Sequence, residues 1–434
     1  MKVFRTIFHL DNIIATLIVF LVIEHFSLYQ NLDFLNPFIN TVQDLNLSDV
    51  VFSKIRNDGR YGVDSNVVLV NIGYLERDGI AKEIEIINKY EPKVLGIDSF
   101  FRTPKDEKQD SLLIESLSNV KSLVLAEKIH YNYEDEIFDS VSYSHPMFTG
   151  NAVFGFANII EDMSGKTYKD MTEEEIEEKE NTLIKSVRQV PIMESIKGRN
   201  EIFLAAKIAE FYAPDKVKKL LERGNDREIV NYRRNLDRYI TLDVKDVFEG
   251  SEKLELIRDK IVLMGFLGPN LETLVHEDIF FTPMNPQFVG KTFPDMYGVV
   301  IHANVLSMIL DESYFYEVPE WASEVLIIVI LFTMMVGLFI LRHVVEIAYE
   351  PLSIGLVFGS LVLWYAIILH LFHTWNIYLE LGDLFFVILL TVPVFEAYQD
   401  SLKPIALRRW AKMNIYFKRK MIDTRKEESE DEEI

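Results

Sequence analysis

Two short apolar stretches, NVVLVNI at residues 66–72 and KVLGIDSFF at 93–101, decide the fold of this chain. Each is rich in strand-forming residues and bounded by turn residues, as buried strands are. Between them, Asp78 to Tyr90 repeats isoleucine at helical spacing. A second helical segment, Thr103 to Leu117, leads to a third predicted strand at Val120 to Ala126. This alternation predicts an α/β domain with a mostly parallel sheet covered on both faces.

More elements of the same kind follow along the chain. Ala152 to Asn158 and Lys260 to Phe266 read as further strands, and Asn200 to Tyr212, stopped by Pro214, and Gly298 to Leu310 read as helices. Residues 161–185 interrupt the pattern with a strongly acidic run that lacks apolar periodicity. We expect a solvated insertion there rather than a metal site, because nothing orders its carboxylates at ligand spacing.

Three apolar runs in the last quarter of the chain predict membrane-spanning helices, for which about 17–25 apolar residues suffice. They are Val325 to Leu341, Pro351 to Phe372 and Ile377 to Phe395. The third run contains Glu380 and Asp383 near its start. Carboxylates within spans often mark ion paths, but this position near one end favours a hydrated place at the membrane interface.

A fourth apolar run, Ile13 to Ile23, follows the basic residues Lys2 and Arg5 and is interpreted in two ways. A cleaved signal peptide has a similar pattern. The residues after the run offer no small-x-small cleavage site, so an uncleaved transmembrane anchor is the preferred interpretation.

The basic residues predict the topology, because positive charge concentrates in cytoplasmic loops. Lys403, Arg408, Arg409 and Lys412 follow the last span, which places the carboxyl end in the cytoplasm. The expected organisation in the cell inner membrane is an anchor at 1–28, an extracytoplasmic domain at 29–321, three spans at 322–396 and a cytoplasmic tail at 397–434. Most of the negative charge lies in 29–321, and the tail is basic and then acidic.

Composition excludes several classes of protein. The 434 residues include no cysteine, so disulfides, thiolate metal centres and cysteine nucleophiles are excluded. A net charge of −22 argues against nucleic-acid binding. The chain lacks the Walker loop, the dinucleotide-binding glycine motif, the G-x-S-x-G elbow and H-E-x-x-H. We therefore expect a protein that is not an enzyme and has no cofactor.

A few residues are candidates for ligand binding. Asp98 follows the second strand, at the edge where open parallel sheets bind ligands, or it caps the next loop. Gly265, Gly268 and Pro269 either bring backbone amides near an anion or form a tight turn. His276, Glu277 and Asp278 could hold a divalent metal with Asp98, but a loop salt-bridged within itself is the preferred interpretation. His302, on an apolar helix, is expected to be a satisfied core histidine.

At these residues the chain resembles the second type of CHASE domain, an extracytoplasmic sensory module of bacterial signalling proteins. The matching stretches are NVVLVNI at 66–72, KVLGIDSFF at 93–101, FGFANI at 154–159, the Arg188 region, DKIVLMGFLGP at 259–269, DIFFTPMN at 278–285 and PDMYGVVIHANVLSMIL at 294–310. Members typically carry one anchor before the domain and three spans after it. They commonly continue into a cyclase or kinase output domain, for which the residues after 396 are too few.

The resemblance implies a sensor that signals to a separate protein partner. The basic block of the tail should also favour anionic membrane lipid, while Glu427 to Glu433 should be repelled from it and face a protein. A homodimer is the default expectation for a sensor of this type. The alternative function is a structural or assembly subunit of a cell-envelope complex that binds no ligand.

Overall fold

The computed structural model describes residues 10–27, 47–56, 61–132, 137–159, 186–285, 293–379 and 382–416. The chain forms two compact units. The sheet domain spans Asn46–Tyr316, and the helical unit combines Met1–Leu45 with Glu317–Ile434. The predicted insertion at 161–185 lies outside the described residues, as do Glu380 and the side chain of Asp383.

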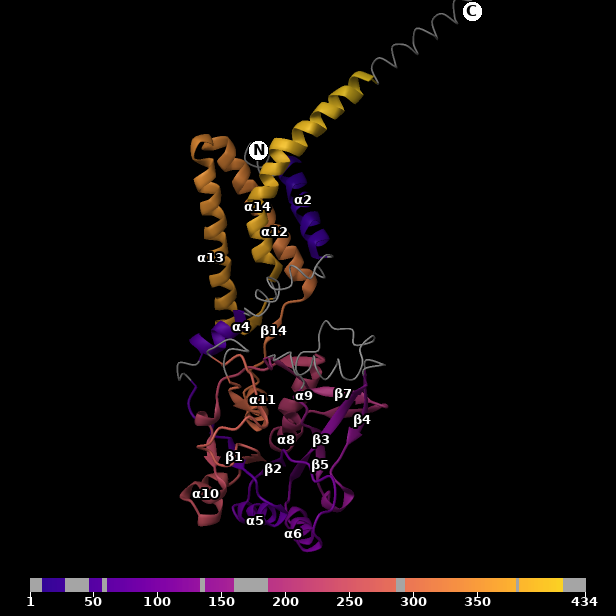
Figure 1. Cartoon of the computed structure of the whole chain (residues 1–434), viewed down its shortest axis with the longest axis vertical. Helices are drawn as coiled ribbons and strands as arrows, with labels where there is room; N and C mark the ends of the chain where they lie inside the picture. The colour runs from indigo at the N-terminus through magenta and orange to yellow at the C-terminus, as the bar shows by residue number, and fades with distance from the viewer. Residues whose placement is uncertain are drawn as a thin grey trace, which may run out of the picture. The chain divides into compact units, whose positions relative to one another are not determined.

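A seven-stranded sheet forms the centre of the sheet domain (Figure 1). Its strands run in the order β10–β1–β11–β2–β3–β4, with β5 also paired to β3. Every pair is parallel except β3 with β4, so the predicted mostly parallel sheet is confirmed. The strands are β1 (Val67–Asn71), β2 (Val94–Ile97), β3 (Leu123–Asn132), β4 (Ile137–Ser142), β5 (Val153–Phe156), β10 (Ile240–Leu242) and β11 (Ile261–Gly265).

The strand β11 lies between β1 and β2, although it follows them by more than 160 residues. Val67 aligns with Ile261 on one side, and Ile261 aligns with Val94 on the other. All residues of β1, β2 and β11 are buried, which agrees with the near-continuous apolar runs of parallel strands. The sequence predicted these three strands but not their order.

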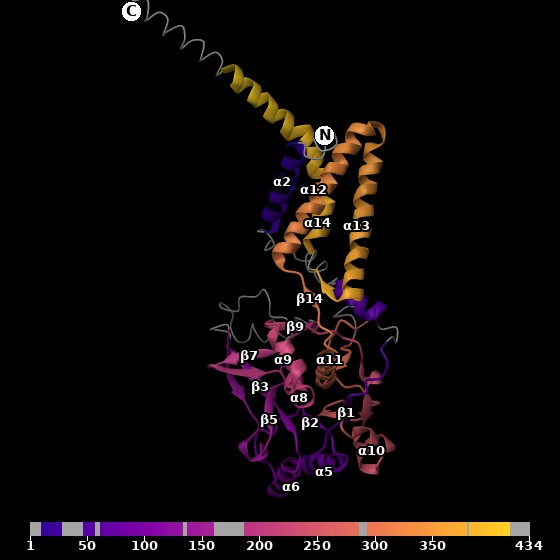
Figure 2. The ribbon, with the colours of Figure 1, turned by 180° about the vertical axis from the view of Figure 1, so that it is seen from behind.

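Helices cover both faces of the sheet, as predicted. On one face α5 (Arg77–Asn88), α6 (Glu107–Ser118) and α10 (Val244–Glu249) pack in one buried core with Val68, Val70, Leu95 and Met264. On the other face Gly96 lies against Ile208 of α8 (Leu204–Tyr212), and Gly265 lies against Val299 of α11 (Gly298–Leu310). Figure 2 shows α5 and α6 on one side of the strands and α8 and α11 on the other.

One predicted helix begins later than expected. Residues 199–202 form the strand β8 (Arg199–Ile202), which pairs with β7 (Met193–Ile196) in a hairpin. The two turn residues, Lys197 and Gly198, both have positive φ, which suits the twist of a two-residue hairpin. The helix α8 starts at Leu204, ends at Tyr212 and is followed by α9 (Pro214–Glu222), so the stop at Pro214 is confirmed.

Short elements complete the sheet domain. They are α4 (Leu47–Val50), η1 (Val51–Ile55), η2 (Pro146–Phe148), β6 (Gln189–Pro191), β9 (Arg227–Ile229), η3 (Leu236–Arg238), η4 (Glu252–Ile257), β12 (Ile279–Phe280) and β13 (Met296–Tyr297). The strands β12 and β13 pair antiparallel and lead directly into α11.

The helical unit contains α2 (Leu10–Ser27), α12 (Glu320–Val344), α13 (Tyr349–Trp375) and α14 (Gly382–Ala397), with η5 (Glu346–Ala348) between α12 and α13. After α14 the π-helical η6 (Tyr398–Leu402) continues as a helix to Tyr416. Two short strands, β14 (Tyr316–Glu317) and β15 (Ile377–Tyr378), flank α12 and α13. Within the described residues, three helical segments are long and apolar enough to cross a membrane: Glu320–Val344, Glu346–Trp375 and Leu384–Tyr416. The N-terminal apolar helix is shorter than these three, so the predicted fourth span is not confirmed.

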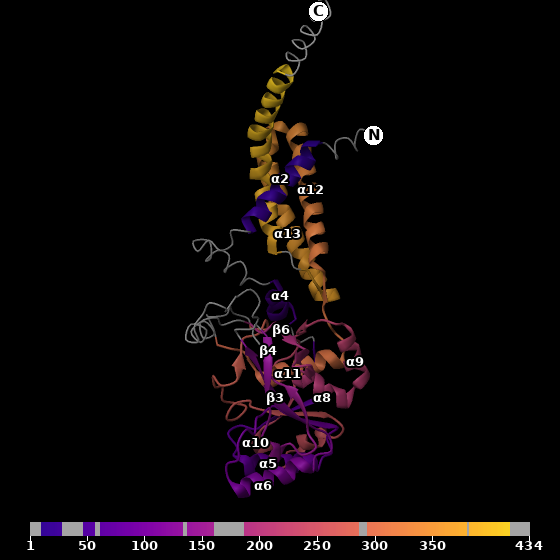
Figure 3. The same cartoon turned by 90° about the vertical axis from the view of Figure 1, so that its right-hand side faces the viewer.

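The helix α2 nevertheless packs with α12 and α14 (Figure 3). Ala15 and Val19 of α2 share a buried cluster with Leu331, Leu338 and Val387. Polar contacts close the same bundle where α2 begins: Asp11 pairs with Lys403 and accepts a hydrogen bond from the Tyr398 hydroxyl at 3.1 Å. Arg342, at the end of α12, pairs with Asp400.

Candidate functional site

The carboxyl ends of β1, β11 and β2 form a topological switch point. The chain leaves β1 and β2 for α5 and α6 on one face, whereas after β11 it leads through β12 and β13 to α11 on the other face. Segments that leave neighbouring strands in opposite directions open a crevice at the sheet edge, where α/β proteins bind ligands. We call this place the carboxyl edge.

Asp98 is the first residue after β2 and lies at this edge. Its backbone N–H donates to Met264 O at 2.8 Å, which holds the chain beside β11. Its side chain keeps 12 % of its surface exposed. Burial, and then the nearby charge of Asp278, raise the pKa of Asp98 to about 8. Among the described residues no loop amide is capped by this carboxylate, so the capping alternative is not what the structure shows.

Asp278 comes to the same edge from the loop before β12. Its φ of 52° is left-handed, and its carbonyl accepts the N–H of Gly298 at 3.0 Å. A Cβ on Gly298 would lie 3.2 Å from both carboxylate oxygens of Asp278, so glycine lets the start of α11 approach this side chain. Asp278 remains exposed, yet the dense protein around it and the charge of Glu277 raise its pKa to about 6.

His302 lies one turn into α11 and is fully buried, as predicted. Its Nε2 is 3.9 Å from Asp98 Oδ2, and its ring lies 4.7 Å from the ring of Phe203. Among the described residues neither ring nitrogen has a hydrogen-bond partner of normal geometry, although the Ala157 backbone lies near enough to act on the ring. Burial lowers the pKa of His302 to about 4, against the opposing effect of the Ala157 backbone, so the ring is neutral near pH 7.

Gly265 and Gly268 flank a tight turn after β11. The side chain of Asn71 fills this turn: it accepts the N–H of Leu267 at 2.9 Å and donates to Gly268 O at 3.1 Å. Gly268 has φ of 96°, and a Cβ there would meet the Thr273 carbonyl at 2.7 Å. The turn alternative therefore accounts for these glycines, since the Leu267 amide is already used by Asn71.

His276 and Glu277 extend the carboxyl edge outward. Glu277 accepts the hydroxyl of Tyr74 at 2.9 Å, and the His276 ring lies 5.1 Å from that of Phe293. Within the part of the chain that the structure describes, the loop forms no internal salt bridge, so the preferred expectation for it is wrong. Nor do three His, Asp or Glu side chains converge there as a metal site. The structure thus brings Asp98, Asp278 and His302 together without the geometry of a metal centre.

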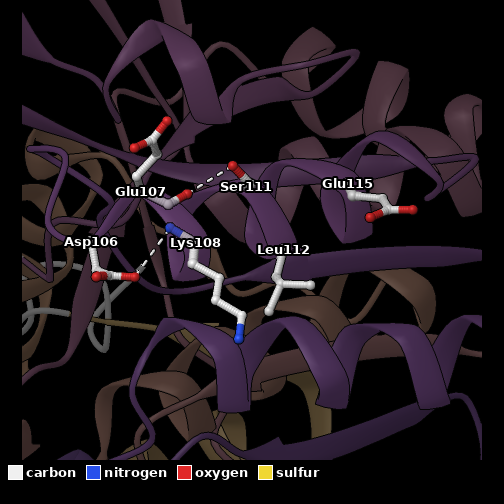
Figure 4. Close-up of a pocket in the computed structure, with 6 residues that line it drawn as sticks. All are labelled: Asp106, Glu107, Lys108, Ser111, Leu112 and Glu115. Carbon is white, nitrogen blue, oxygen red and sulfur yellow. Dashed lines mark hydrogen bonds between the residues drawn. The ribbon is translucent and has the colours of Figure 1, made fainter.

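Sequence reasoning missed Asn71, Tyr74 and Phe266 at this edge. Tyr74 and Phe266, which follow β1 and β11, have ring centroids 5.3 Å apart. The available signal was their position: each lies at or just beyond the carboxyl end of a predicted strand, and Asp98 lies at such an end too. A hollow of about 510 Å³ lies along α6 between Asp106 and Glu115 (Figure 4). It contains no residue of the carboxyl edge, and most of its side chains are exposed.

Comparison with known proteins identifies the family of this domain. A family model described as CHASE2 domain matches residues 41–339. The chain belongs to the CHASE2 family. No curated protein and no solved structure gives a match.

Membership of the CHASE2 family confirms the resemblance found in the sequence and identifies an extracytoplasmic sensory domain. The match covers the whole sheet domain and extends into α12. The three apolar helical segments identify a membrane protein. The CHASE2 match assigns no ligand to the carboxyl edge, so Asp98, Gly265, Gly268, His276 and Asp278 remain predictions.

Proposed function

We propose that this protein is a bacterial inner-membrane sensor that crosses the bilayer four times and signals to a separate protein partner. In this proposal the CHASE2 domain lies in the periplasm and responds to a solute at its carboxyl edge. The helical unit carries the response to the cytoplasmic tail.

The observation that carries the proposal is the link between Asp11 and Lys403. The segments on both sides of the sheet domain lead to α2 and α12, and both helices pack on α14. Asp11 of α2 pairs with Lys403, and Arg342 of α12 pairs with Asp400. Both pairs lie where the helix that continues to Tyr416 begins, which we call the tail helix. A change in the spacing of α2 and α12 would therefore act directly on the start of the tail.

The same contacts support the fourth span. The first turn of α2, the end of α12 and the residues just after α14 meet at one end of the bundle, which carries Arg342 and Lys403. Positive charge of this kind marks the cytoplasmic end. The 18 residues of α2 give about 27 Å of helix, close to the thickness of about 30 Å that a span must cover.

The tail helix offers a surface for a partner. From Leu402 to Tyr416 the described side chains are mostly exposed, among them Leu407, Trp410 and Met413. Arg408, Arg409 and Lys412 alternate with them. Exposed apolar side chains next to cations suit an amphipathic protein surface with acidic groups, and the cations also suit anionic lipid.

The test is co-purification from the native bacterium after gentle detergent extraction. The wild-type chain is expected to retain a stoichiometric partner, and Leu407→Ser combined with Trp410→Ser is expected to lose it. Leu112→Ser, a similarly exposed apolar residue on α6, serves as the control. Loss of the partner in the control, or retention in the tail variant, would contradict the proposed role of the tail.

A second comparison separates sensing from assembly. An exchange of charges, Asp11→Lys with Lys403→Asp, should keep the pair and the partner, whereas Asp11→Asn alone should change how much partner is retained. If partner binding is the same in all three chains, the helical unit does not relay a signal, and the assembly function is favoured.

A further inference from the structure

Three carboxyl groups lie in a row along the carboxyl edge. Asp98 is deepest, Asp278 lies beside it, and Glu277 is outermost. Each acts on its neighbour: Asp278 raises the pKa of Asp98, and Glu277 raises that of Asp278. No Lys or Arg among the described residues forms an ion pair with any of them. An uncompensated group of this kind favours a ligand that brings positive charge.

A buried polar group points to the same place. His302 has no exposed surface, and among the described residues neither of its ring nitrogens has a hydrogen-bond partner of normal geometry. Its Nε2 faces Asp98 Oδ2 at 3.9 Å, beyond hydrogen-bonding distance. Leaving a buried polar atom unsatisfied costs free energy. A bound molecule at the same place is one source of the missing partner.

Aromatic rings lie beside these carboxyl groups. Phe266 lies 5.3 Å from Tyr74 and 6.1 Å from Tyr297, measured between ring centroids. Tyr74 is 63 % exposed, although its hydroxyl is fixed to Glu277 at 2.9 Å. Aromatic faces next to carboxylates are the usual recognition chemistry for organic ammonium groups, which bind by cation–π attraction and charge pairing.

We infer that the carboxyl edge binds a small organic cation with an ammonium group, held by Asp98, Asp278 and Glu277 against the ring of Tyr74. This deepens the proposed sensing function by naming the class of its ligand. An inorganic divalent ion is the less suitable occupant, because the described His, Asp and Glu side chains do not converge at metal-ligand spacing. Such an ion would also make no use of the exposed aromatic ring.

The test uses the full chain in lipid nanodiscs and measures binding by calorimetry. Choline and ethanolamine are the probes, and dimethylbutanol, the neutral isostere of choline, is their control. Magnesium chloride and sodium acetate are the inorganic and anionic arms. We expect saturable binding of at least one ammonium probe and none of the other compounds. Equal binding of dimethylbutanol, binding of magnesium alone, or no binding by either ammonium probe would overturn the inference.

Variants then assign the site. Glu277→Gln, on an exposed loop, should weaken the binding of the ammonium probe roughly tenfold by removing a charge-assisted contact. Tyr74→Leu should weaken it roughly threefold through the lost cation–π contact. Glu272→Gln, which removes an exposed carboxylate elsewhere in the same loop, should leave it unchanged. Unaltered binding in both Glu277→Gln and Tyr74→Leu would place the ligand elsewhere and refute the assignment.

These measurements need no partner protein, so their outcome does not depend on whether the proposed signalling role is correct. If an ammonium ligand binds but leaves partner association unchanged, the relay is wrong and the ligand class stands. If partner association responds to some stimulus while neither ammonium probe binds, the ligand class is wrong and the relay stands.

Discussion

Glu83 should make the sheet domain less stable as the pH rises. It lies on α5, fully buried, and neither of its carboxylate oxygens has a hydrogen-bond partner. Burial, and then the nearby charge of Asp243, raise its pKa from 4.5 to about 8. The folded chain therefore holds a proton that the unfolded chain releases above pH 4.5.

The sign follows from this difference in proton binding. Below the unfolded pKa both states are protonated, so Glu83 has no pH-dependent effect on folding. Between pH 4.5 and about 8 the free energy of unfolding falls by about 1.4 kcal/mol for each pH unit, and above the folded pKa the loss is complete. At pH 7 the loss is about 3 kcal/mol on this reasoning.

Replacing Glu83 with glutamine should remove that pH dependence. Glutamine also leaves a buried polar group unpaired, so Glu83→Gln should match the wild type at pH 4.5 and exceed it at pH 7. A domain of this size gains about 2 °C in Tm per kcal/mol, which predicts an increase of about 6 °C at pH 7. The assay is thermal unfolding of the full chain in detergent at several pH values, followed by tyrosine and tryptophan fluorescence.

A matched control lies on the same helix. Glu85 is exposed and pairs with Lys89, so Glu85→Gln should leave Tm and its pH dependence nearly unchanged. If Glu83→Gln retains the pH profile of the wild type, or melts at a lower temperature at pH 8, the buried carboxyl is not protonated in the folded state. The reasoning would then be refuted.

Two further substitutions test the packing around the sheet. Gly268→Ala should lower the free energy of unfolding by about 1–3 kcal/mol, because its φ is positive and its Cβ would strike the Thr273 carbonyl. Denaturant unfolding measures this. Gly198→Ala, at a positive φ in open space, isolates the backbone cost and should destabilise the chain less. Arg77→Met should lower Tm more than Arg77→Met combined with Asp110→Leu, because the single change leaves Asp110 buried without its cation. Equal melting temperatures for the two Arg77 variants would contradict a structural role for this buried pair.

The sequence predicted the elements of the sheet better than their order. Apolar runs such as Val67–Asn71 and Ile261–Gly265 are local signals, so these strands were found almost to the residue. The insertion of β11 between β1 and β2 depends on contacts between residues far apart in the chain, which no local pattern carries. The hairpin of β7 and β8 was missed because its turn, Lys197-Gly198, lacks the more common Asn-Gly or Asp-Gly pair.

The candidate site was predictable only in part, for a related reason. Asp98 was found because a charge directly after a buried strand is visible in the sequence. The sequence brought Asp278 together with Asp98 only in the metal hypothesis, and it did not predict that His302 lies beside them, since a loop and a helix reach the edge by different routes. Asn71 resembled any polar residue at a strand end, and only the structure shows that its side chain holds the turn at Gly268.

The same turn connects the carboxyl edge to the face of the sheet that α5 and α10 cover. Asn71 donates to Asp243 at 2.9 Å, and Asp243 accepts the N–H of Leu271 as well as capping α10. The charge of Asp243 is the one that acts on Glu83 of α5. Because a charged Glu83 would repel the nearby, partly buried carboxylate of Asp243, loss of the Glu83 proton would disturb Asp243 first. The turn at Gly268, beside the proposed ammonium site, is therefore the part of the domain whose contacts depend most directly on whether Glu83 is protonated.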